Sequence, residues 1–227
     1  MNDSYGESVI LENAGLSDVF LAEYFLGTPE CMGITVLSPS EAGNIMEVGQ
    51  DCTIQWRSAG LASNARVRIE LCNAAGTACV IAPAVKNTGK YRWRVGKWDP
   101  KFGRSYNSGI DYKIRVCTID GKATGESAAQ FAVARLTGVS LKGPSAVKGG
   151  SDSVQYVCTA FYDVFPEGVT RSSDAKWKCL PTVYAQLRRA GVLSTTPVPA
   201  PTQFTLQAMY GKGKSAFAGA LDVTITP

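Results

Sequence analysis

Apolar and polar positions alternate with a period of two along most of the chain after residue 50. In the segment RVRIEL, the apolar side chains of Val67, Ile69 and Leu71 alternate with charged ones. Residues 90–95 and 112–116 follow the same rule, with aromatic or aliphatic side chains on one face and Lys or Arg on the other. A period of two predicts β-strands that bury one face. Helical periodicity is nearly absent, so the sequence predicts an all-β protein.

The predicted strands fall into two blocks. Residues 33–134 contain roughly seven short strands separated by Gly, Asn, Asp and Pro turns, which is the pattern of an immunoglobulin-like (Ig-like) sandwich. Residues 137–227 form the second block, whose first strand follows the letters LTG, and they close with a hairpin around GKGKS. We expect a short junction at residues 134–138, with few contacts across it. Residues 1–32 add two apolar runs. The predicted fold is therefore two tandem Ig-like β-sandwiches with an N-terminal acidic strand segment.

Three parts of the chain resemble known families. Residues 34–134, with ITVLSPSEAG, IQW, NTGKYRWRV and DYKIRV, resemble the N-terminal domain of the Ser/Thr-rich, GPI-anchored yeast cell-wall protein family, a module that bacterial secreted proteins also carry. Residues 137–226, with TGVSLKGPSAVKGG, VTRSSDAKW and ALDVTIT, resemble bacterial Ig-like domains of invasin and intimin type. They depart from that family at DVFPEG, where it usually turns with Asp-Gly. Residues 5–25 look like the end of a bacterial surface repeat. None of these families implies a catalytic site.

The charge is unevenly distributed along the chain. The net charge is +4, but residues 1–32 carry six acidic residues and no Lys or Arg, whereas residues 33–134 and 135–227 each carry a net charge of +5. This contrast favours docking of the acidic segment onto a basic block of its own chain or of a neighbouring copy. An extended segment of this kind can pair with the exposed edge of a sheet. We therefore expect residues 5–26 to pair with a sheet edge, either of their own chain or, in self-association, of a neighbouring copy.

Composition excludes several classes of function. The chain contains no histidine, so Ser-His-Asp catalysis, Cys-His catalysis and His-ligated metals are excluded. The GKGKS turn is similar to the end of a phosphate-binding loop, but Ala208 stands where that motif needs its first glycine, and a strand is predicted after it. No apolar run is long enough to cross a bilayer. We predict no catalytic residue, no cofactor, no metal ligand and no membrane insertion.

Two cysteines flank a turn of small residues in CNAAGTAC. If the strands on either side pair symmetrically, Cys72 and Cys79 lie opposite each other, within reach of a disulfide. A metal site would need a second pair of ligands, and a redox site would need the Cys-x-x-Cys spacing. We predict a Cys72–Cys79 disulfide, with two free thiols as the alternative.

The remaining five cysteines leave more than one pairing open. Cys158 and Cys179 both fall on the inward face of predicted strands, and either a bridge between the sheets or two buried thiols fits that pattern. Cys117 is out of phase with the inward residues of its strand, which favours a Cys31–Cys117 bond over Cys52–Cys117. Seven cysteines in modules of this type indicate an oxidising, extracellular compartment.

Basic side chains gather on the outward faces of the first block. The alternation predicts one basic face on each sheet, the first formed by Arg66, Arg68, Lys113 and Arg115, and the second by Arg92 and Arg94 next to Arg57. Such residues are first of all the solvated side of a strand. A functional basic face for an anionic glycan or for a neighbour's acidic segment is the alternative. Exposed aromatic residues for stacking are not evident, so no nucleic acid is expected.

These observations predict a non-enzymatic, extracellular structural or adhesive module of a bacterial cell-surface assembly. Its partners would be further copies of itself or neighbouring surface-protein domains. An accessory carbohydrate-binding module of a secreted hydrolase is the alternative. A flat row of exposed Trp or Tyr would favour glycan binding, and exchange of a strand between copies would favour assembly.

Overall fold

The computed structural model describes residues 32–62, 64–97, 99–101, 107–181, 183–213 and 216–227. Within these residues the regular structure is strand apart from short 3-10 turns, one of them at Arg189–Gly191. The predicted all-β class is therefore confirmed. The strand segment predicted for residues 1–32 lies outside the described residues, except for Met32.

The first nine described strands form two sheets that face each other. Their bounds are β1 (Gly33–Ser38), β2 (Ile45–Glu47), β3 (Asp51–Ala59), β4 (Arg66–Asn73), β5 (Gly76–Lys86), β6 (Lys90–Arg94), β7 (Gly109–Thr118), β8 (Thr124–Glu126) and β9 (Phe131–Ala134). One sheet has the order β1-β3-β6, and the other has the order β2-β9-β7-β4-β5 with β8 beside β7. β1 pairs with β3, whereas β2 crosses to the opposite sheet and runs parallel to β9. This is an Ig-like sandwich.

The remaining strands repeat this plan. Their bounds are β10 (Leu136–Lys142), β11 (Ala146–Lys148), β12 (Val154–Gln155), β13 (Val157–Tyr162), β14 (Phe165–Thr170), β15 (Lys176–Leu180), β16 (Ala185–Leu187), β17 (Val192–Thr195), β18 (Thr202–Tyr210) and β19 (Phe217–Thr226). One layer combines β10-β13-β14 with β12-β17-β16, because β12 leads directly into β13. The other layer has the order β11-β19-β18-β15. Here too a short early strand, β11, runs parallel to the last strand. The second sandwich is therefore also Ig-like.

Each sandwich has its own core, built from the inward residues of alternating strands. In the first, Trp56 and Trp93 are buried among aliphatic side chains. Their indole nitrogens find acceptors, since Trp56 Nε1 donates to Asn87 Oδ1 (2.8 Å) and Trp93 Nε1 donates to the Lys97 carbonyl (2.8 Å). In the second, the core includes Tyr156, Leu193, Leu206, Val223 and Ile225. The alternation in the sequence thus predicted the buried face of most strands.

At one edge of the first sandwich, a glycine lets two strands of opposite sheets approach each other closely. β8 pairs with β7, and its Gly125 lies so close to β1 of the other sheet that a Cβ there would stand 2.1 Å from the carbonyl oxygen of Ile34. Only glycine allows this approach of two backbones. β1 is thereby covered by β8, while β6 is the other outer strand of that sheet and β2 and β5 are the outer strands of the opposite sheet.

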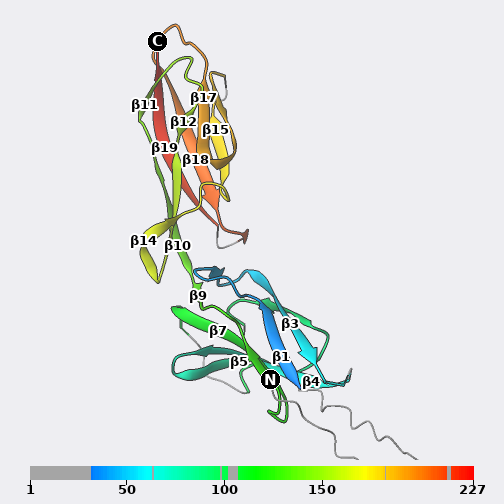
Figure 1. Ribbon diagram of the computed structural model, residues 1–227. Coiled ribbons are helices and arrows are strands. Elements are labelled where there is room, and N and C mark those ends of the chain that lie inside the picture. The colour runs from blue at the N-terminus through cyan, green and yellow to red at the C-terminus, as the bar shows by residue number, and fades with distance from the viewer. Residues whose placement is uncertain (1–31, 63, 98, 102–106, 182, 214–215) are drawn as a thin grey trace, which may run out of the picture.

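The two sandwiches lie end to end, so that the molecule is elongated (Figure 1). β9 leads into β10 through Arg135. Among the described residues, strands before Arg135 pair only with one another, and so do strands after it. The sandwiches also touch through side chains of both.

Candidate functional site

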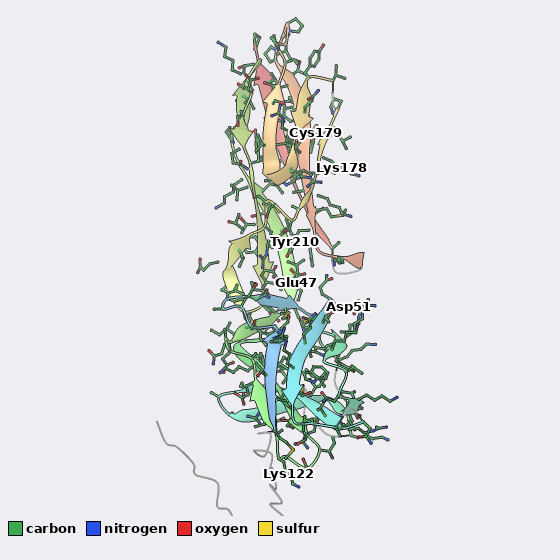
Figure 2. The ribbon with its side chains drawn as sticks, turned by 45° about the vertical axis from the view of Figure 1, so that its right-hand side comes forward. Glu47, Asp51, Lys122, Lys178, Cys179 and Tyr210 are labelled. Carbon is green, nitrogen blue, oxygen red and sulfur yellow. The ribbon has the colours of Figure 1, made fainter. Side chains whose placement is uncertain are left out.

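A polar cluster joins the two sandwiches. Glu47 ends β2 in the first sandwich, and its Oε1 accepts hydrogen bonds from the hydroxyls of Tyr162 (2.8 Å) and Tyr210 (2.5 Å) of the second. The Tyr162 hydroxyl also lies 3.3 Å from that of Tyr210 and accepts a hydrogen bond from Arg171 Nε (3.4 Å). Figure 2 places Glu47 and Tyr210 on either side of the junction. We call Glu47, Tyr162, Tyr210 and Arg171 the junction cluster.

Both tyrosines act as donors in this cluster. Burial raises the pKa of Tyr162 above its ordinary value. Burial, followed by the hydrogen bond to Glu47, raises the pKa of Tyr210 as well. The two phenols therefore stay protonated at neutral pH and can donate to the carboxylate. Hydrogen bonds to a charged acceptor are stronger than those between neutral groups.

A second contact fixes the other side of the junction. Asp163 forms the tip of the hairpin between β13 and β14, and its Oδ1 accepts from the Arg135 amide (2.9 Å). Its Oδ2 accepts from Ser108 Oγ (2.5 Å) of the first sandwich, and its own amide donates to the Arg135 carbonyl (3.1 Å). The hairpin tip is thus attached both to the linker and to the first sandwich.

Apolar side chains from both sandwiches pack between these polar contacts. Tyr162 and Ala134 are buried there, with Ile45 of β2 and Phe165 of β14 against them. The rings of Tyr162 and Phe165 meet edge to face, with centroids 6.3 Å apart. The junction thus combines a carboxylate acceptor, hydrogen bonds to the backbone and apolar packing.

The first predicted basic face is interrupted by acidic residues. β4 and β7 do bring Arg66, Arg68, Lys113 and Arg115 onto one sheet, but Glu70 stands opposite Arg115. Glu70 is only 4% exposed, and its carboxylate lies 2.8 Å from Arg68 Nε and 3.5 Å from Arg115 Nη1. The Arg68 contact is an ion pair without the geometry of a hydrogen bond.

The same face carries a second carboxylate. Glu126 of β8 accepts a hydrogen bond from Arg115 Nε (2.8 Å), and Arg115 Nη2 lies 2.7 Å from the same carboxylate oxygen. Two carboxylates therefore hold two of the four basic residues in place. This arrangement gives a structural role to Arg68 and Arg115, and it reduces the positive charge that a ligand would meet.

The second predicted basic face is more open. Arg92 and Arg94 of β6 stand opposite Thr53 and Asp51 of β3, and Arg57 lies further along β3. Arg92 Nη2 is 2.7 Å from Asp51 Oδ2, yet the Arg92 side chain is 76% exposed. The hydrogen bond from Arg92 is the main cause that lowers the pKa of Asp51. Together with Lys90, these cations face solvent.

The predicted Cys72–Cys79 geometry is wrong. A tight turn pairs Asn73 with Gly76, and Cys72 therefore stands opposite Thr77. The register then shifts, so that Cys79 stands opposite Leu71 and points into the core. Cys72 lies on the outward side, 3.9 Å from Thr77 Oγ1, and both cysteines are free thiols. The sequence argument assumed symmetrical strands, and a β-bulge breaks that symmetry.

The other cysteines among the described residues are also free. Cys158 lies on β13, next to β10 and β14, whereas the Cys179 thiol on β15 is 3.4 Å from the Ala185 carbonyl on β16. Both side chains point inward, as predicted. The strand of Cys158 pairs with β10 and β14, whereas the strand of Cys179 pairs with β18. Cys117 faces outward near the Arg68 carbonyl, and Cys52 is half-buried; both are free. Cys31 lies outside the described residues.

The described residues show neither a metal-binding group nor a membrane-spanning helix. They contain no group of three or more Cys, Asp or Glu side chains placed to hold a metal ion. They contain no helix with the length and apolar character that crossing a membrane requires.

Comparisons with known proteins return structures only. No protein-family model matches the chain, and no curated protein matches it. Among solved structures, three N-terminal domains of the bacteriophage RB49 outer capsid protein Hoc share 16% identity at a TM-score of 0.38, over 86% of this chain and 59% of that one. Sidekick-1 immunoglobulin domains 1–4 share 11% identity at a TM-score of 0.31, over 88% and 49%.

A third similar structure comes from a bacterium. It is a SusE-like, surface-located polysaccharide-binding protein from the Bacteroides thetaiotaomicron heparin utilisation locus, with 13% identity at a TM-score of 0.28, over 87% of this chain and 34% of that one. The chain thus spans less than two thirds of each of these structures. At such identities and TM-scores, the similarities assign the chain to no family.

Proposed function

We propose that the chain is a non-enzymatic structural or adhesive module of a bacterial cell-surface assembly, in which two Ig-like sandwiches act as one rigid spacer. The observation that carries this proposal is the junction cluster, because Glu47 binds two tyrosines of the other sandwich. A flexible pair of modules needs no such contact, whereas a spacer that sets a distance at a surface does. The sequence resemblances to cell-wall and invasin-type modules suggest an extracellular setting, although no family model matches the chain.

The alternative is a carbohydrate-binding module of a secreted hydrolase. Such sites usually present flat aromatic rings to the sugar. Among the described residues, the large apolar side chains that are exposed include Phe217 but no Trp or Tyr. This favours the structural role over a stacking type of glycan site.

Assembly would use the acidic N-terminal segment. We infer that residues 5–26 add to the edge of a sheet, in their own chain or in a neighbouring copy. β5 offers the longest outer strand in the first sandwich, from Gly76 to Lys86. To test this, residues 1–30 are deleted, and sedimentation and electron microscopy of the two chains are compared. Equal association with and without the segment would exclude it from assembly.

Small-angle X-ray scattering tests the rigid spacer. The unmodified chain should fit one elongated arrangement of the two sandwiches, and E47A combined with D163A should broaden the distribution of distances. D222A is the matched control, because Asp222 accepts a hydrogen bond from Thr205 (2.7 Å) within one sheet of the second sandwich. A chain that already samples many interdomain angles without any substitution would contradict the proposal.

A further inference from the structure

An outer strand of the first sandwich carries a row of exposed cations. In β6, Lys90, Arg92 and Arg94 face solvent, whereas Trp93 is buried and Tyr91 is half-buried. β6 is the last strand of the β1-β3-β6 sheet, so nothing in that sheet covers its far side. Because residues two apart on a strand point to the same side, neighbouring cations in the row are about 7 Å apart.

Cations from two other elements extend this row. Arg57 is exposed on the adjoining strand β3. Lys212 belongs to the turn between β18 and β19 of the second sandwich and is also exposed. Tyr210, two residues before it, binds Glu47, which lies four residues before Asp51. Asp51 stands opposite Arg94, so the Lys212 turn lies near the Arg94 end of the row. Figure 2 shows Asp51 at the end of the first sandwich that faces the second.

The junction cluster holds the Lys212 end of the row in position. Tyr210 precedes Lys212 by two residues, and its hydroxyl is bound to Glu47 of the first sandwich. The hairpin that carries Lys212 is therefore tied to the sandwich that carries β6. The row spans both sandwiches as one surface because the junction is fixed.

Few of these charges are neutralised. Among the described residues, the salt bridge that involves the row is the one between Arg92 and Asp51. The face on β4 and β7 differs, since there the buried Glu70 holds Arg68 and Arg115. A ligand that approaches β6 thus meets cations whose partners are mostly solvent.

The surroundings of the row select one class of partner. The flanking rings of Tyr91 and Trp93 point inward, so they form no platform on which the bases of single-stranded nucleic acid can stack. Addition of a peptide strand is also disfavoured. The Lys90 carbonyl already accepts from Thr88 Oγ1 (3.1 Å), and the Arg94 carbonyl accepts from the Lys97 amide (2.9 Å). Binding through charge alone remains, and it suits a flexible polymer with acidic groups along its length.

We propose that Lys90, Arg92, Arg94, Arg57 and Lys212 form a binding face for a linear anionic polysaccharide, carboxylated or sulfated, which lies along β6 and crosses the junction. This inference rests on the proposed role as a surface module. It names an adhesive partner for that module, and it does not involve a sugar site built from stacked aromatic rings.

Binding of fluorescent polymers to the full chain tests the proposal. The probes are dextran sulfate, polygalacturonate and neutral dextran, measured by fluorescence anisotropy at low and high salt. We expect both acidic polymers to bind at low salt, neutral dextran not to bind, and binding to fall at high salt because exposed charges are screened. R92E/R94E should weaken binding by about tenfold or more, since two ion pairs are lost and repulsion is added.

The matched control is K176E/K178E. It makes the same change in net charge on β15, another outer strand, which carries two exposed lysines; Figure 2 places Lys178 in the second sandwich, away from Asp51. It should change binding by less than about threefold. Circular dichroism verifies that each variant folds.

Several outcomes would overturn the proposal. Equal losses in R92E/R94E and K176E/K178E would mean that only net charge matters. Equal or tighter binding of polyglutamate would point to an acidic protein as the partner, and equal or tighter binding of an oligo(dT) strand would point to nucleic acid. No binding of any polymer would remove the face but leave the scattering test of the rigid spacer untouched, so the two failures are distinguishable.

Discussion

The Tyr210 hydroxyl donates a 2.5 Å hydrogen bond to Glu47 Oε1, although the two residues are 163 positions apart and belong to different sandwiches. Tyr162 donates to the same oxygen from a position 115 residues away. One carboxylate on β2 of the first sandwich thus binds residues from two strands of the second, β13 and β18. The relation makes the junction part of the folded structure rather than a loose linker.

The first prediction concerns removal of this carboxylate. In E47A, two tyrosine hydroxyls lose their charged acceptor in a mostly buried place, so the coupling between the sandwiches should fall by about 2 kcal/mol. Urea unfolding followed by tryptophan and tyrosine fluorescence should change from one transition to two separated ones. D222A should keep the single transition. Coincident unfolding of both sandwiches in E47A would contradict a coupling through Glu47.

Sequence patterns predicted the strands better than the contacts between them. Val67, Ile69 and Leu71 were expected to face the core, and they are buried. The same alternation marks Glu70 as an outward, solvated residue, yet it is 4% exposed because Arg68 and Arg115 fold over it. A period of two predicts the side of the sheet on which a residue lies, but it does not predict whether neighbouring side chains cover that residue.

Contacts that depend on register or on distant pairs were not predictable from one sequence. The Cys72–Cys79 argument failed because the strands slip by one position after Leu71. Nothing in the letters around Glu47 distinguishes it from a surface acid, because its partners come from β13 and β18. The alternation predicted which basic residues share a face. It did not predict that Glu70 and Glu126 would bind Arg68 and Arg115 on the β4–β7 face while most cations of β6 stay exposed.

The second prediction compares the two carboxylates on the β4–β7 face. E70A leaves Arg68 and Arg115 without their buried partner and should lower the free energy of unfolding by about 2 kcal/mol. E126A removes an acid whose side chain is 39% exposed, and it should cost less than about 1 kcal/mol. Chemical denaturation of both variants measures the difference. Equal costs would show that burial of Glu70 does not set its contribution.

The third prediction concerns the thiols of Cys72 and Cys79. Both are buried, and burial raises the pKa of Cys79 to about 12. Because only the thiolate reacts, iodoacetamide should modify neither cysteine in the folded protein at pH 8 and both after unfolding in urea. Peptide mapping without reduction measures this. Recovery of a linked peptide containing both residues from native, air-oxidised protein would show that the register around the turn differs from the one described.

The fourth prediction is a loss of stability at alkaline pH that depends on Tyr156. This phenol is fully buried and donates to the Pro144 carbonyl (2.8 Å), and burial raises its pKa to about 12. The unfolded chain releases this proton near the ordinary tyrosine pKa, whereas the folded chain keeps it. The stabilisation is therefore fully present below about pH 10 and is lost between about pH 10 and pH 12, by an amount of about 2–3 kcal/mol.

Y156F separates this effect from other groups that titrate in the same range, such as the Cys79 thiol. The variant loses one hydrogen bond at every pH, at a cost of about 1 kcal/mol, but it has no proton to release at position 156. The difference in unfolding free energy between the unmodified chain and Y156F should therefore shrink or reverse from pH 9 to pH 11.5. A difference that stays constant over this range would mean that Tyr156 ionises equally easily in the folded and unfolded chains. In that case its burial among the core residues of the second sandwich would have no electrostatic consequence.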